Sequence, residues 1–288
     1  MRTENFIIDG SKGKPITLDV SWFENGVKKP VIIFSHGFKG FKDWGHFNLV
    51  AKEFAEAGFV FVKYNFSYNG TTPENLTETL DLDAFGNNNF SLELDDLALV
   101  IDFFCRTSTG LSVTKEISDF QNEIDTDQLF LLGHSRGGGI TLLKSAEDAR
   151  VKKAVTWAAI SDTYSRMNPP ELVDWRRDGV AYVQNFRTGQ NLPLYFQFYE
   201  DFTKNINRLD LVPVSKKIKI PVLIFHGKKD DSVLWQEAVE LNKNIPGSEL
   251  YMMEEADHTF GGKHPWTENR LPLDTQEIIA KSISFLLK

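Results

Sequence analysis

The pentapeptide Gly133-His134-Ser135-Arg136-Gly137 has the residue types of a site for nucleophilic chemistry. It follows the apolar run LFLL and precedes a segment with helical spacing, which is the strand, turn and helix context of a G-x-S-x-G nucleophile elbow. The turn of such an elbow is so tight that side chains two positions before and after the serine would collide with the backbone, so both positions are glycine. The pattern predicts Ser135 as a nucleophile. The simpler alternative is a glycine-rich turn whose serine caps the helix.

A nucleophilic serine needs a base to accept its proton and an acid to orient that base. In the fold that carries this elbow, the two partners follow the serine in the order Asp or Glu, then His. Asp230 lies three residues beyond one apolar strand, and His258 lies five residues beyond the next. Both are expected where loops leave the carboxyl edge of a sheet. The sequence therefore predicts a triad of Ser135, Asp230 and His258.

Other residues could fill the same roles. Asp231 and Asp162 are alternative acids, although Asp231 is expected to start the following helix, where its charge would lie near the positive helix end. His264 is the alternative base. Three of the remaining histidines are predicted to be structural, with hydrogen-bonded rings beside tight turns: His36, His134 and His226. His46 is set aside as the base because it belongs to the start of an early helix and precedes the nucleophile.

Acyl transfer also requires N–H donors for the oxyanion. One is expected to be the backbone N–H of Arg136, directly after the nucleophile, and the other an N–H of the loop 36–40. We choose Phe38 in that loop, because Gly37 lets the backbone turn inward. The Arg136 side chain could equally form a surface salt bridge, so only its amide is given a role.

Apolar periodicity indicates the elements that must position these residues. Strands and helices alternate, which predicts an α/β fold with a mostly parallel sheet, helices on both faces and an antiparallel N-terminal edge. Residues 65–91 are expected to form a long loop. Strands are expected near 5–8, 16–23, 31–35, 59–64, 129–133, 154–159, 222–227 and 249–253, and helices near 47–54, 97–104, 135–145, 233–244 and 274–287.

Residues 162–216 interrupt this alternation and are predicted to form an inserted cap, with 1–161 and 217–288 as the core. The insert is rich in aromatic residues, and two of its segments flank the turn RTGQN as a hairpin would. Most of these aromatics are expected to form a small core of the cap itself. A few, with Trp175 and Phe198 as candidates, are expected to line a substrate pocket.

Composition excludes several classes of function. A net charge of −8 and a pI near 5.3 argue against a nucleic-acid partner. No apolar run is long enough to cross a bilayer, no metal-binding spacing is present, and the N-terminus lacks a signal-peptide pattern. The single cysteine, Cys105, cannot form an intramolecular disulfide. These features favour a cytoplasmic protein with no membrane partner.

The segments SHGFKG, GHSRGG, HGKKDDSV and ADHTF resemble the oxyanion loop, elbow, acid turn and histidine loop of the α/β-hydrolase family. The resemblance covers nearly the whole chain. Within the family, the sequence resembles the bacterial esterases related to cinnamoyl and feruloyl esterases and to the prolyl-oligopeptidase-type catalytic domains. It implies a sheet of about eight strands, the Ser135–Asp230–His258 triad, no cofactor, and an insert that shapes the acyl pocket.

The expected function is that of a serine esterase that hydrolyses a small-molecule carboxylic ester through an acyl-enzyme. Two alternatives remain open. A serine peptidase or amidase would use the same residues, and a ligand receptor on the same fold would bind without turnover.

Overall fold

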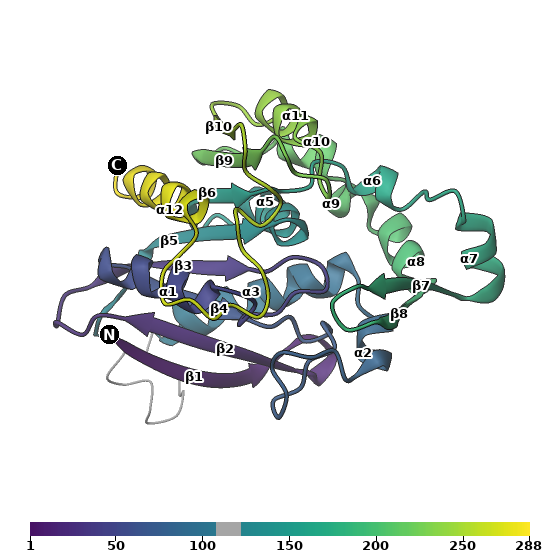
Figure 1. Ribbon diagram of the computed structural model, residues 1–288, viewed down its shortest axis with the longest axis horizontal. Coiled ribbons are helices and arrows are strands. Elements are labelled where there is room, and N and C mark those ends of the chain that lie inside the picture. The colour runs from purple at the N-terminus through teal and green to yellow at the C-terminus, as the bar shows by residue number, and fades with distance from the viewer. Residues whose placement is uncertain (108–121) are drawn as a thin grey trace.

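Figure 1 shows the computed structural model, which describes residues 1–107 and 122–288. In this part of the chain eight strands form one sheet in the order β1-β2-β4-β3-β5-β6-β9-β10. The pairs β1–β2 and β2–β4 are antiparallel. The other strands of this sheet run parallel to one another, in the order β4, β3, β5, β6, β9 and β10. The predicted α/β fold is therefore confirmed. The strands are β1 (Arg2–Asp9), β2 (Pro15–Trp22), β3 (Lys29–Ser35), β4 (Val60–Tyr64), β5 (Ile124–His134), β6 (Val151–Trp157), β9 (Val222–Gly227) and β10 (Glu249–Met253).

The central strands are buried on both faces because helices cover both sides of the sheet. Alternate residues of β3 point to opposite sides, so that Val31 and Ile33 join one core while Ile32 and Phe34 join the other. The first core also holds apolar residues of α3 (Phe90–Thr107), α5 (Arg136–Glu147) and α11 (Gln236–Asn244). The second holds those of α1 (Phe47–Glu56) and α12 (Leu273–Leu286). Continuous apolar runs such as VIIF are what a strand covered on both faces requires.

Some predicted boundaries are wrong. The expected loop 65–91 contains the short helix α2 (Leu82–Gly86), and α3 already begins at Phe90. Asp81 caps α2 by accepting a hydrogen bond from the Ala84 N–H at 2.9 Å. A helix of five residues is too short to produce a recognisable apolar period. A second short element, the 3₁₀ helix η1 (Ser11–Gly13), joins β1 to β2.

The insert leaves the sheet after β6 and returns at β9, on the side toward which the parallel strands point (Figure 1). It contains the predicted hairpin as an antiparallel pair, β7 with β8. Its elements are α6 (Thr163–Arg166), α7 (Leu172–Asp178), β7 (Val180–Asn185), β8 (Gln190–Tyr195), α8 (Gln197–Lys204), α9 (Ile206–Leu209) and α10 (Leu211–Ser215).

The insert has no apolar core of its own, contrary to the prediction. Its buried aromatics Trp175, Phe198 and Phe202 belong to the same cluster as the residues of α3 and α5. Tyr182 and Phe186, on and just after β7, are exposed instead. So short a segment cannot enclose a separate core, and it buries its apolar side chains against the main one. Within residues 1–107 and 122–288, none of the helices combines the length and the apolar content that crossing a lipid bilayer demands.

Candidate active site

Ser135 occupies a strained turn between β5 and α5. Its φ of 57° and ψ of −123° are angles that residues with a side chain rarely adopt. A Cβ added at Gly133 would lie 2.3 Å from the carbonyl oxygen of Gly137, and one added at Gly137 would lie 2.3 Å from that of Ser35. Any side chain at either position would clash with the backbone, so both residues must be glycine. The Ser135 side chain makes no capping hydrogen bond to α5, so it does not serve as the helix cap.

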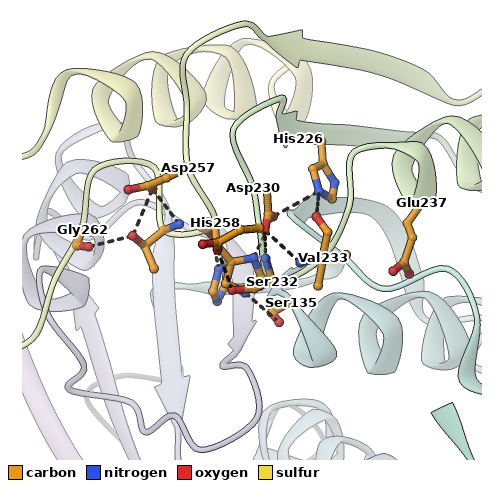
Figure 2. A network of polar contacts seen from close by, with 12 residues as sticks. Ser135, His226, Asp230, Ser232, Val233, Glu237, Asp257, His258 and Gly262 are labelled. Atoms are coloured by element: carbon orange, nitrogen blue, oxygen red, sulfur yellow. Dashed lines mark hydrogen bonds and ion pairs between the residues drawn. The ribbon is translucent and has the colours of Figure 1, made fainter. Parts of the chain in front are cut away.

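The structure brings the three predicted residues into one hydrogen-bonded chain (Figure 2). His258 Nε2 lies 3.1 Å from Ser135 Oγ, and His258 Nδ1 lies 2.7 Å from Asp230 Oδ2. They come from the turn after β5, the loop after β9 and the loop after β10. With Nδ1–H donating to the carboxylate, Nε2 is left as an acceptor facing the serine hydroxyl. This arrangement allows His258 to take a proton from Ser135.

Asp230 is buried and held by four donors. Its Oδ1 accepts from the backbone N–H groups of Ser232 at 2.9 Å and Val233 at 2.8 Å, and its Oδ2 receives His258. His226 Nε2 lies 3.2 Å from the same Oδ2. Burial by itself raises the pKa of the Asp230 carboxyl, but hydrogen bonds from His226, His258 and Val233 outweigh burial and hold the pKa well below its usual range. The carboxylate is therefore ionised when it meets the imidazole.

The alternative acids and base are engaged elsewhere. Asp162 caps α6 by accepting from the Ser165 N–H at 3.0 Å. Asp231 accepts from the Ser232 hydroxyl at 3.2 Å. It does not start a helix as predicted, since α11 begins only at Gln236. His264 Nδ1 accepts from the Gly45 N–H at 2.9 Å.

His134, inside the elbow, contacts the histidine of the chain directly. Its Nε2 donates to the carbonyl oxygen of His258 at 2.8 Å, and the two ring centroids are 4.8 Å apart. Burial lowers the pKa of His134 to about 3, so its ring is neutral at physiological pH. His134 therefore fixes the loop that carries His258. The sequence placed it as a structural histidine, but no spacing rule links it to a residue 124 positions away.

Hydrogen bonding of the other structural histidines is less complete than predicted. His36 Nδ1 donates to the Gly37 carbonyl at 2.9 Å, and His226 Nε2 donates to the Val233 carbonyl at 2.8 Å. The Nδ1 atoms of His226 and His46 are buried and find no partner among the described residues. For His226, the prediction of a hydrogen-bonded ring therefore holds for only one of its two nitrogens.

The loop 36–40 passes directly beside the serine. A Cβ added at Gly37 would lie 3.0 Å from Ser135 Cβ, and Lys39 takes a positive φ of 59° that turns the loop. The Phe38 N–H donates no hydrogen bond within residues 1–107 and 122–288. The Arg136 N–H is the first of α5, and first-turn amides have no partner inside their helix. Neither N–H is committed to another acceptor in the described residues, and both remain predicted oxyanion donors.

The Arg136 side chain forms a salt bridge, the alternative left open by the sequence, but this salt bridge is buried and not at the surface. Its Nε donates to Glu93 Oε2 at 2.9 Å, and both side chains are less than a tenth exposed. Its guanidinium carbon lies 5.1, 4.5 and 4.8 Å from the ring centroids of Phe38, Phe90 and Phe198. The side chain therefore joins the oxyanion loop, α3 and the insert.

A cavity of about 690 Å³ opens beside Ser135 and His258 under the insert. Trp175 and Phe198, the two predicted pocket residues, are among its lining residues. Trp175 is fixed by donating its Nε1–H to the Leu194 carbonyl at 2.8 Å. A smaller cavity of about 140 Å³ also reaches Ser135 and His258, between the loop 36–40 and His134. In the two described parts of the chain, no group of three or more His, Cys, Asp or Glu side chains is placed to hold a metal ion.

Eight-stranded topology and a serine elbow at the carboxyl end of β5 define the α/β-hydrolase class. The family model described as alpha/beta hydrolase fold matches residues 30–197, more than half of the chain, so the chain belongs to that family.

Individual relatives are distant. The human protein Serine hydrolase BPHL (Homo sapiens) is 24% identical over 171 residues, which are 55% of this chain and 56% of that protein. The chain thus spans about half the length of this curated relative. Est1E from Butyrivibrio proteoclasticus is 16% identical with a TM-score of 0.70, covering 98% of this chain and 97% of Est1E. Est1E has also been solved with ferulic acid bound. The acylaminoacyl peptidase of Pyrococcus horikoshii is 14% identical with a TM-score of 0.67, covering 99% of this chain and 41% of the peptidase.

Proposed function

We propose that this protein is a serine hydrolase that cleaves small carboxylic esters through an acyl-enzyme. The observation that carries the proposal is the hydrogen-bonded chain from Ser135 Oγ through His258 to a buried, ionised Asp230, at the mouth of a cavity with mostly apolar lining. A nucleophile, its base and an orienting acid in this geometry are the requirements of acyl transfer. Membership of the α/β-hydrolase fold family supports the same chemistry.

In the first step Ser135 Oγ attacks the ester carbonyl carbon while His258 Nε2 takes the hydroxyl proton. A bond forms between Oγ and the carbonyl carbon, and the developing oxyanion is held by the amides of Phe38 and Arg136. Asp230 keeps Nδ1 protonated and stabilises the imidazolium. The bond from carbon to the alcohol oxygen then breaks, and His258 gives its proton to the leaving alcohol.

In the second step a water molecule attacks the acyl-enzyme. His258 accepts a proton from the water, the bond between the acyl carbon and Ser135 breaks, and the proton returns to Oγ. The released carboxylic acid leaves through the cavity. Trp175 and Phe198 are the proposed contacts of the bound substrate, since both line the cavity and are themselves held rigidly.

The test combines covalent labelling with turnover. A fluorophosphonate should label the wild-type protein, and hydrolysis of 4-nitrophenyl butyrate should exceed that of an alanine 4-nitroanilide. Ser135→Ala should lose both labelling and ester hydrolysis while keeping its melting temperature, because it removes one oxygen from a turn. Labelling that persists in this variant would identify another nucleophile. Faster cleavage of the anilide would favour a peptidase, and tight ester binding without turnover in the wild type would favour a receptor.

We also propose that the protein acts in the cytoplasm, as its composition suggests. Three of its four N-glycosylation sequons begin with asparagines whose side chains are buried, Asn65, Asn69 and Asn89, which argues against the secretory route. Fractionation of the native host with an antibody to this chain tests this, and recovery from a secreted or periplasmic fraction would contradict it.

A further inference from the structure

Positive side chains gather around the large cavity although the protein as a whole carries a net charge of −8. Lys39, Arg136 and Arg166 line it, and Glu171 is the one acidic residue among the described residues that do so. The other lining is largely apolar. A cationic wall in an acidic protein needs a specific explanation, because a charge beside apolar surface is poorly hydrated.

Two of these three cations are neutralised by carboxylates behind the wall. Arg136 is paired with Glu93 at 2.9 Å. Arg166 is paired with Glu237 at 2.5 Å. Each pair leaves the cavity with little net charge from that arginine. The pairs hold α3, α5, α6 and α11 together, and their internal role is sufficient to explain them.

Lys39 differs, because no carboxylate lies within ion-pair distance of its ammonium among the described residues. Its Nζ donates to the Gln184 carbonyl of β7 at 3.2 Å, which leaves two of its three N–H groups without an acceptor in residues 1–107 and 122–288. Burial lowers the pKa of Lys39, and no neighbouring anion opposes that effect. The ammonium also lies 5.9 Å from the centroid of the Phe38 ring, but among the described residues it has no anionic partner at the cavity wall.

The position of Lys39 relates it to the reacting atoms. It follows Phe38 in the oxyanion loop, and it lines both the 690 Å³ cavity and the 140 Å³ cavity, which share Ser135 and His258. Its backbone has the positive φ of 59° at which glycine would be unstrained. A lysine here thus carries backbone strain, which a role for its side chain would justify.

We propose that the substrate is an ester bearing a carboxylate, and that Lys39 binds this carboxylate while Ser135 attacks the ester carbonyl. The inference rests on the proposed esterase function and specifies its substrate class. A carboxylate would accept the free N–H groups of the ammonium and neutralise its charge. The competing explanation is that Lys39 only ties the oxyanion loop to β7 through Gln184.

The experiment compares esters that differ only by carboxylate against carboxamide, a neutral group of the same shape. One pair, mono-4-nitrophenyl adipate and 4-nitrophenyl adipamate, carries the carboxylate or the carboxamide in the acyl group. The other places it in the alcohol, as 3-carboxyphenyl acetate and 3-carbamoylphenyl acetate. For the wild type we expect kcat/KM to favour the carboxylate by about fivefold or more in one of the pairs, the value for a partly exposed charged contact.

Variants of Lys39 distinguish a role in substrate binding from a purely structural role, in which Lys39 only links the loop 36–40 to β7 through Gln184. Lys39→Met keeps the Cβ, the backbone strain and nearly the length of the side chain, and should bring the carboxylate-to-carboxamide ratio to about one. Lys39→Arg should retain most of the ratio, and Lys39→Glu should reverse it. Lys52→Met, at an exposed position of α1 that pairs with Glu56, is the matched control for net charge and should leave the ratio unchanged.

Each result decides the matter. Carboxamides hydrolysed as fast as carboxylates in both pairs would overturn the inference and leave the esterase intact. A carboxylate preference that survives Lys39→Met would overturn the assignment to Lys39. Equal losses on both members of each pair would show the structural tie instead. If none of the four esters is hydrolysed while 4-nitrophenyl butyrate is, the inference falls and the esterase stands. If 4-nitrophenyl butyrate is not hydrolysed either, the proposed function and this inference fall together.

Discussion

His226 Nε2 lies 3.2 Å from the same Asp230 oxygen that receives His258 Nδ1. The His226 ring is fully buried, and its Nε2–H is shared with the Val233 carbonyl at 2.8 Å. His226 thus acts on the base through the carboxylate that orients it. The sequence signal that could have identified His226 is its position near the end of β9, four residues before Asp230.

Replacing His226 should therefore weaken catalysis without touching the substrate. His226→Leu removes the donor and should lower kcat about tenfold, the lower range for a lost hydrogen bond to a charged group. His226→Gln keeps an N–H donor and should recover part of the loss. Steady-state kinetics of both variants, with melting temperatures as the control for folding, provides the measurement. Equal kcat values for Leu and Gln would contradict this role.

The acid can be tested by a pair of adjacent aspartates. Asp230→Asn removes the carboxylate that fixes the tautomer of His258 and should lower kcat by about 10³-fold or more at neutral pH, following the effect of the same exchange in an unrelated serine protease. Asp231→Asn is the matched control and should lose less than about tenfold, because Ser232 is the only hydrogen-bond partner of its carboxylate among the described residues. A large loss in Asp162→Asn with near wild-type rates in Asp230→Asn would reassign the acid.

Cap aromatics should control which acyl groups are accepted. Trp175→Ala or Phe198→Ala should change the ratio of kcat/KM between a bulky and an acetyl ester by about 10- to 100-fold, since each lost apolar contact is worth roughly 1–3 kcal/mol in discrimination. Phe186→Ala serves as the control, because that ring on the same insert is 85% exposed. Uniform losses on all esters would indicate that the two aromatics only support the fold.

Buried histidines should make the protein sensitive to acid. Burial lowers the pKa of His36 and of His46 from 6.5 to about 4 in each case. Between pH 6.5 and about pH 4 the unfolded chain binds more protons than the folded chain, so the free energy of unfolding falls as the pH falls. Each histidine should remove on the order of 2 kcal/mol from the free energy of unfolding between pH 7 and pH 5.

His46→Asn provides the check for this linkage. The variant lacks one of the groups that take up a proton on unfolding, so its free energy of unfolding should fall less steeply from pH 7 to pH 5. Urea denaturation at three pH values measures the slope. An unchanged slope would mean that His46 does not contribute to the acid sensitivity.

Much of the architecture could be predicted because β strands covered on both faces leave long apolar runs. The positions of Ser135, Asp230 and His258 relative to strand ends were readable for the same reason, since the carboxyl ends of parallel strands meet at one edge. Their mutual distances were not readable. These depend on loop paths such as the one that His134 fixes by donating to His258.

Arg136 illustrates where pattern reasoning fails. An arginine is normally placed at the surface, and its burial depends on Glu93, which lies 43 residues earlier in the chain. Composition cannot show that two opposite charges will share one interior site. The same holds for Phe198 and Phe202 of the insert, which pack against Phe90 of α3, more than 100 residues earlier in the chain.

The first and last parts of the insert contact each other directly, because the Thr163 hydroxyl donates to the Leu209 carbonyl at 2.7 Å and accepts from the Leu211 N–H at 3.0 Å. Its two ends therefore remain close together whatever lies between them, and a longer or shorter segment would cost little in chain-closure entropy. Exchanging the insert between related proteins should therefore change the range of accepted substrates, while Ser135, Asp230 and His258 stay in place. The exchanged segment should end before α10, because Leu211 and Val214 of that helix are buried in the main core and should be kept with it.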